Sequence, residues 1–95
     1  MHQEDEVKLT GLISKIYPPM ITPAGVKVAR IVLEHNSEQM EGGALRYVKC
    51  RIYCVYVAAE INQELLDHHV SVTGFLSVNT KKKLVLHITN LKNLD

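Results

Sequence analysis

The stretch of chain from residue 22 to residue 39 constrains the fold more than any other. It opens with Thr22-Pro23-Ala24-Gly25, a turn in which proline sets φ and glycine accepts a positive φ. Residues 26–35 then have strand character, and the pattern breaks at Asn36-Ser37. A further strand, 69–78, is interrupted by Gly74, as expected where a strand bends sharply at a barrel corner. These features in a chain of 95 residues are typical of a small closed β-barrel.

The order of the elements indicates which barrel this is. Alternation of apolar and polar residues predicts strands at 7–17, 26–35, 45–57, 69–78 and 84–90. A polar loop with paired glycines is expected at 36–44 and a turn at 79–83, while residues 58–67 have helical composition and allow about two turns. This β-β-β-α-β-β order is that of the OB-fold, an all-β, five-stranded barrel with a short helix between strands three and four. An SH3-like barrel, which usually lacks the helical piece, is the alternative.

Composition limits the class of partner. Residues 1–6 are expected to form a polar tail and residues 7–95 a single OB-fold domain. The formal net charge is +1, so there is no global basic field, and a nucleic acid would have to be held by a local patch. No run approaches the roughly 18 apolar residues that span a bilayer, and the first residues are acidic and polar, unlike a signal peptide. We therefore expect no membrane partner and a cytoplasmic location.

The two cysteines are predicted to be reduced. Cys50 and Cys54 are four residues apart in one predicted strand, which separates their Cα atoms by about 13 Å. A disulfide needs less than about 7 Å, so we expect two half-buried core thiols. Two ligands at this spacing are too few for a metal, and the five histidines lack partners at metal-ligand spacing. No metal site and no cofactor are predicted.

Strand 45–57 carries the best functional signal. Val48, Cys50, Ile52 and Cys54 form one apolar face, which is expected to point to the core. The opposite face carries a basic pair flanked by two aromatic residues: Tyr47, Lys49, Arg51 and Tyr53. If Ile31 and Leu33 face inward, Arg30 joins this patch from the neighbouring strand. Such surfaces bind single-stranded nucleic acid, because cations hold phosphates while rings stack on bases. A merely solvated strand face, with Tyr as an ordinary β-former, is the alternative.

The 79–83 turn adds a compact positive group beside that face. Lys81, Lys82 and Lys83 are consecutive and could bridge successive phosphates. The alternative is that they only solubilise a hairpin tip and guard an edge strand. The sequence contains no nucleophile–base pair, phosphate-cradling glycine loop or recognisable carboxylate pair, so an enzyme is not expected. The predicted nucleic-acid-binding residues are Arg30, Tyr47, Lys49, Arg51, Tyr53, Lys81, Lys82 and Lys83.

Five short segments, in order, resemble a known family. They are Leu9-Thr10-Gly11, Thr22-Pro23-Ala24-Gly25, Val32-Leu33-Glu34-His35, Val72-Thr73-Gly74-Phe75-Leu76 and Val85-Leu86-His87. Together they resemble the bacterial primosomal replication protein PriB (primosomal replication protein N) family, which is related to the single-stranded DNA-binding proteins. The resemblance implies an OB-fold homodimer that binds single-stranded DNA and, with other primosome proteins, assists the helicase PriA in restarting stalled replication forks.

The chain departs from that family at several positions, which keeps other functions open. Lys49 stands where well-studied members carry a Trp, and Met20 and Asn36 stand where they carry basic residues. The first alternative is therefore a protein-interaction adaptor in which nucleic-acid binding is weak or vestigial. The second is an RNA-binding OB domain, because a stacking platform does not separate RNA from DNA without a contact to the 2′-hydroxyl.

Overall fold

The computed structural model describes residues 5–95, and it is built almost entirely of strands. Of the predicted polar tail, residues 1–4 lie outside this range. The elements are β1 (Val7–Ile16), β2 (Met20–Ile21), β3 (Lys27–Glu41), β4 (Ala44–Val57), the 3-10 turn η1 (Gln63–Leu65), β5 (His69–Val78) and β6 (Leu84–Asn93). All five predicted strands are present, and the two-residue strand β2 is an addition that the sequence pattern did not indicate.

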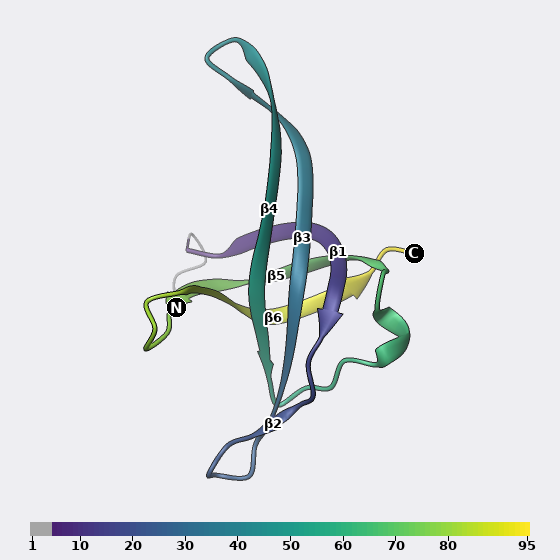
Figure 1. The fold of residues 1–95 in the computed structure, drawn as a ribbon, viewed down its shortest axis with the longest axis vertical. Helices are drawn as coiled ribbons and strands as arrows, with labels where there is room; N and C mark the ends of the chain where they lie inside the picture. Colours follow the sequence, from purple (N-terminus) through teal and green to yellow (C-terminus); the bar gives the residue numbers. More distant parts are fainter. Residues whose placement is uncertain (1–4) are drawn as a thin grey trace.

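The five long strands close into a barrel in the order β1-β5-β6-β4-β3, with β3 pairing back to β1. Closure is possible because β1 serves two neighbours: its first half, Val7–Leu12, pairs with β5, and its second half, Leu12–Ile16, pairs with β3. The β4–β6 pairing is parallel and all others are antiparallel. Figure 1 shows β1 curving across the barrel from one neighbour to the other. This confirms the OB-fold.

A compact apolar core fills the barrel. Every long strand contributes at least one side chain to it, and no charged residue is buried among residues 5–95. The core consists of Ile13, Ile31, Leu33, Cys54, Val70, Val72, Leu86 and Ile88. Alternate residues of each strand supply these side chains, so the intervening residues face outward.

The β3–β4 hairpin extends far beyond this core, and the prediction of a loop at 36–44 was wrong. β3 continues to Glu41, and only Gly42 and Gly43 form the turn, with φ of 58° and 81°. Positive φ at both central residues matches the twist of the strands, which is why paired glycines suit a two-residue hairpin. We call residues 36–49 the arm; it projects away from the barrel and gives the molecule its longest extent, 50 Å (Figure 1).

The arm also corrects the prediction for one of the thiols. Cys54 lies in the core, as predicted, and is fully rather than half buried, but Cys50 is exposed. Both belong to the same face of β4, yet the core ends between them, so Val48 and Cys50 continue the inward-facing register into solvent. Both cysteines are free.

The connection between β4 and β5 is not the predicted two-turn helix. Only the short turn Gln63–Leu65 forms, with Asn62 Oδ1 accepting a hydrogen bond from the Glu64 amide. Ala58 and Asp67, at the two ends of the segment, have positive φ, which no right-handed helix tolerates. Within residues 5–95, no helix is long and apolar enough to cross a membrane.

Gly74 lies where two backbones approach closely. A β-bulge interrupts the β5–β6 ladder between Thr73 and Gly74. A Cβ atom at position 74 would lie 1.8 Å from the carbonyl oxygen of His87, which is far inside van der Waals contact. The predicted interruption of the strand at Gly74 is therefore present as a β-bulge, and glycine is required there because its neighbour is backbone rather than a movable side chain.

Candidate nucleic-acid interface

The register of β3 and β4 defines the outer face of the barrel. Because Ile31 and Leu33 are buried, the alternate residues of β3 point outward. Across the ladder, Arg30 pairs with Val55, Val32 with Tyr53, and Glu34 with Arg51, and paired residues share a face. Arg30, Arg51 and Tyr53 thus lie on one surface, as the sequence predicted.

Tyr17 organises one end of this outer face. Its ring meets that of Tyr53 edge to face, with centroids 5.9 Å apart. Two cations lie against the same ring: the Lys15 ammonium at 4.6 Å and the Arg30 guanidinium at 5.5 Å from its centroid. Arg30 Nη2 also donates a hydrogen bond to the Pro18 carbonyl oxygen over 2.7 Å. Cation–π contacts and this bond fix the positive groups beside two aromatic rings.

The centre of the face carries a screened ion pair. Arg51 Nε lies 3.3 Å from Glu34 Oε1, and the Arg51 side chain is 64% exposed. An exposed pair of this kind contributes about 1 kcal/mol or less, so a phosphate could compete for the guanidinium. The outer face, continued along the arm, carries Lys15, Arg30, Lys49 and Arg51 against the carboxylates of Glu34 and Glu38, while Arg46 and Glu41 of the arm pair with each other. Its local balance is positive although the whole chain is almost neutral.

Tyr47 and Lys49 continue this face along the arm but do not join the barrel cluster. They pair with Glu38 and Asn36, on the same side of the ribbon as Tyr53. Six residues of strand separate Tyr47 from Tyr53, which is about 20 Å. Tyr47 is 79% exposed, so its ring has few contacts with the rest of the protein. The predicted patch is therefore an extended stripe rather than a single cluster.

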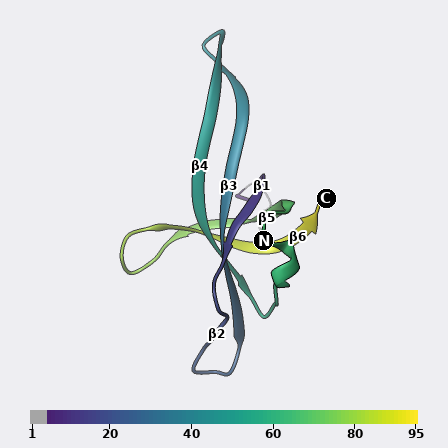
Figure 2. The same cartoon turned by 45° about the vertical axis from the view of Figure 1, so that its right-hand side comes forward.

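The three lysines lie at the tip of the β5–β6 hairpin, where Asn79 organises the turn. Asn79 Oδ1 accepts hydrogen bonds from the Lys81 and Lys83 amides, and the Asn79 carbonyl accepts one from Lys82. All three side chains are exposed. The tip emerges beside β4, because Val85 pairs with Tyr53. It then diverges from the arm, as both Figures 1 and 2 show.

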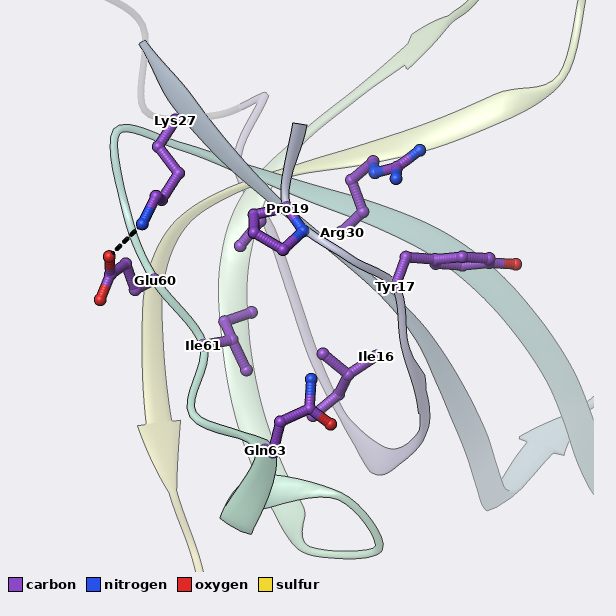
Figure 3. Close-up of a pocket in the computed structure, with 9 residues that line it drawn as sticks. Ile16, Tyr17, Pro19, Lys27, Arg30, Glu60, Ile61 and Gln63 are labelled. Carbon is purple, nitrogen blue, oxygen red and sulfur yellow. Dashed lines mark hydrogen bonds and ion pairs between the residues drawn. The ribbon is translucent and has the colours of Figure 1, made fainter. Parts of the chain in front are cut away.

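A shallow pocket of about 230 Å³ opens next to this face. Ile16 and Ile61 give it an apolar floor, and it shares Tyr17 and Arg30 with the outer face (Figure 3). On one side, Lys27 Nζ donates to Glu60 Oε1. This hydrogen bond, and then the Lys27 charge, lower the pKa of Glu60. Because these two charges satisfy each other, Arg30 is the cation of the pocket lining that pairs with no carboxylate of residues 5–95.

Four residues of the outer face were missed by the sequence reasoning. Lys15 and Tyr17 belong to it through the Tyr17 ring contacts, and Phe75 and His87 through the pairing of β6 with β4. The sequence analysis placed Tyr17 at the end of a strand and gave it no role. Its position two residues after Lys15, on the same side of a strand, could have indicated a second pairing of a cation with an aromatic ring. No sequence signal could have placed His87 beside Val55, because that parallel pairing joins segments about thirty residues apart.

Comparison with known proteins agrees with this architecture. A family model described as another single-strand binding protein family matches residues 5–90. Replication restart protein PriB of Neisseria meningitidis serogroup C (strain 053442) is 37% identical over 90 residues, covering 90% of each chain. That of Photorhabdus laumondii is 32% identical over 97 residues, covering 92% of this chain and 90% of the relative. The solved structure of PriB from Ralstonia solanacearum superposes with a TM-score of 0.82 at 24% identity, covering 96% of this chain and 98% of that one.

Proposed function

The chain belongs to the replication restart protein PriB family of single-strand binding proteins, and from this membership we propose that it is a single-stranded DNA-binding accessory protein of the replication-restart primosome. In this role it assists a PriA-type helicase and contacts other primosome proteins. It binds and positions DNA, and it catalyses no reaction. Because a bacterial chromosome lies in the cytoplasm, a protein with this role acts there.

One observation carries the proposal: the outer face combines fixed cations with aromatic rings on a single surface. Arg30 and Lys15 lie against the Tyr17 ring, which in turn contacts Tyr53. Phosphates of a single strand need such cations, and unpaired bases need such rings. A duplex offers phosphates but hides the faces of its bases, so this face favours single strands.

The arm and the lysine tip extend the surface on which a strand can lie. Tyr47 and Lys49 add a ring and a cation on the same side of the β3–β4 ribbon. Lys81, Lys82 and Lys83 add charge at the second hairpin. These residues are proposed as DNA contacts together with Arg30, Arg51 and Tyr53.

A titration with labelled oligo-dT, followed by fluorescence anisotropy, tests the proposal. Duplex DNA and oligo-U of matched length are titrated in parallel. We expect oligo-dT to bind more tightly than the duplex at every salt concentration. Equal or tighter binding of the duplex would contradict a single-strand role, and a clear preference for oligo-U would favour the RNA-binding alternative.

The adaptor function remains a second candidate because one predicted cation is already engaged. Arg51 is paired with Glu34, and Lys49 replaces the aromatic residue expected there, so the face has fewer free contacts than its family implies. An adaptor would stimulate a PriA-type helicase on forked DNA without binding oligo-dT itself. Measuring helicase stimulation beside the titration separates the two.

We also propose that the protein is a homodimer. A barrel of 95 residues has a high ratio of surface to volume, and two-fold dimers are the commonest assembly. Several large apolar side chains on the two hairpins are about half exposed, including Leu45, Leu76 and Leu84. Light scattering at micromolar concentrations is expected to give twice the chain mass, and a monomer mass throughout would refute the dimer.

A further inference from the structure

A stacked pair of rings, Phe75 and His87, belongs to the outer face but is not among the residues proposed above as DNA contacts. The ring centroids are 4.8 Å apart and the planes differ by 3°. Phe75 is nevertheless 48% exposed, so His87 covers one side of the phenyl ring and the other side remains accessible. Singly exposed apolar side chains are normal on proteins, so what sets this ring apart is its stacked geometry rather than its exposure alone.

The strand register places this pair on the outer face. Phe75 of β5 pairs with His87 of β6, His87 pairs with Val55 of β4, and Val55 pairs with Arg30 of β3. Since directly paired residues point to the same side, these four form one row across four strands. At about 4.8 Å per strand, the row spans roughly 14 Å from Arg30 to Phe75. The next row contains Val32, Tyr53, Val85 and Ser77.

The pair is held rigidly. His87 Nε2 and Ser77 Oγ are joined by a hydrogen bond of 2.6 Å, which fixes the plane of the imidazole. Phe75 follows Gly74, whose backbone lies tightly against the His87 carbonyl. The phenyl ring is thus preorganised by the imidazole behind it and by the backbone beneath it, and little conformational entropy remains to be lost on binding.

We propose that Phe75, supported by His87, is a stacking platform for one base of a bound single strand. The proposal rests on the proposed DNA-binding function and deepens it by adding a base site on the β5–β6 hairpin. The turn that carries the three lysines, residues 79–83, begins about 13 Å beyond Phe75 along the same hairpin. A single strand whose phosphates bind there can therefore place a base on the phenyl ring. Positive charge next to a flat, exposed ring suits a nucleotide better than an apolar protein segment.

The test compares the wild type with Phe75→Leu and Phe75→Trp on oligo-dT and on an abasic oligomer of equal length. Leucine keeps apolar contact but has no ring, so we expect about a 5-fold loss on oligo-dT, the fold-change for ~1 kcal/mol of base stacking. We expect no difference between this variant and the wild type on the abasic oligomer, which has the same phosphates but no bases. Tryptophan should retain the affinity. As the chain has no natural Trp, its fluorescence should be quenched by oligo-dT.

The outcomes separate this inference from the function on which it rests. Wild-type protein that fails to bind oligo-dT overturns both. If the wild type binds and Phe75→Leu binds oligo-dT equally well, the base site is wrong while the function stands, and a protein contact at Phe75 becomes the better explanation. An equal loss on the abasic oligomer would also overturn it. Val78→Ala, which truncates an exposed side chain on the other face of the same hairpin, is the control and should bind like the wild type.

Discussion

At the scale of single residues, the two cysteines differ because the core ends between them. Burial raises the pKa of the Cys54 thiol to about 12, so almost none of it is thiolate at neutral pH. Cys50 is exposed where the arm joins the barrel. We expect a thiol reagent at neutral pH to label one cysteine of the native protein quickly and the second only after unfolding. Cys50→Ser should abolish the fast reaction. Rapid labelling of that variant would show that Cys54 is accessible.

The face of the strand on which a side chain lies was predictable from sequence where alternation alone decides it. Arg30, Arg51 and Tyr53 were placed correctly because each neighbours a residue that must be buried. Cys50 was misplaced by the same rule, since alternation tells which side of a strand a residue occupies but not whether anything covers that side. Coverage depends on where the other strands end, which is a property of the assembled barrel.

At the scale of elements, the β5–β6 ladder depends on a single glycine. In Gly74→Ala, the added methyl would lie 1.8 Å from the His87 carbonyl oxygen. The backbone must shift to accept it, and we expect a loss of about 3 kcal/mol or more in the free energy of unfolding. Denaturant unfolding measures this. Val78, on the same strand, is 62% exposed, so Val78→Ala should lower the free energy of unfolding by about 0.5 kcal/mol or less. Similar values for the two variants would contradict the close approach.

The arm is expected to be separable from the stability of the barrel. No arm residue belongs to the core, so its pairing is supported mainly by its own ladder. In a shortened variant, residues 38–47 are replaced by Asn-Gly, which favours a two-residue turn between the paired Ser37 and Val48. We expect the free energy of unfolding to change by about 1 kcal/mol or less, while oligo-dT binding weakens because Tyr47 is lost. A large loss of stability would mean that the arm supports the barrel.

The misassigned elements have a common physical cause. Residues 36–41 are polar except for Met40, and polarity predicts a loop only where a strand must bury one face. The arm buries neither face, so its ladder tolerates polar residues. In the 58–67 segment, helical composition was outweighed by the short span between β4 and β5 and by the left-handed residues at its ends. Strand bounds such as those of β5, in contrast, were predictable from the run of alternating residues.

At the scale of the whole molecule, the outer face exists only because the barrel closes. The parallel β4–β6 pairing brings the second hairpin beside the first, and with it the lysine tip and the Phe75–His87 pair. The sequence indicated the pieces of the candidate site on β3 and β4 because they are adjacent along the chain. It also indicated the three lysines of the 79–83 turn, but not the Phe75–His87 pair, whose place on this face depends on a long-range pairing that local periodicity does not encode.

This assembly predicts how DNA binding depends on salt. If about four phosphates are neutralised by Arg30, Lys49, Arg51 and the lysine tip, log K should fall against log salt with a slope of about −2.8, at −0.7 per contact. Raising salt from about 50 to 200 mM then costs roughly 50-fold in affinity for oligo-dT.

Replacing Lys81, Lys82 and Lys83 together by Ala should flatten the slope by up to about two units. The turn should persist, because Asn79 organises it through backbone amides.

Lys92→Ala, at the opposite end of β6 from the tip, is the control and should leave the slope unchanged. Replacing Tyr47 or Tyr53 should weaken binding by up to ~1–3 kcal/mol without changing the slope, because stacking releases no counterions. If the triple-lysine variant binds oligo-dT like the wild type at every salt concentration, the tip is only a solvated turn. The barrel would then hold a strand by its outer face alone, without the lysine tip.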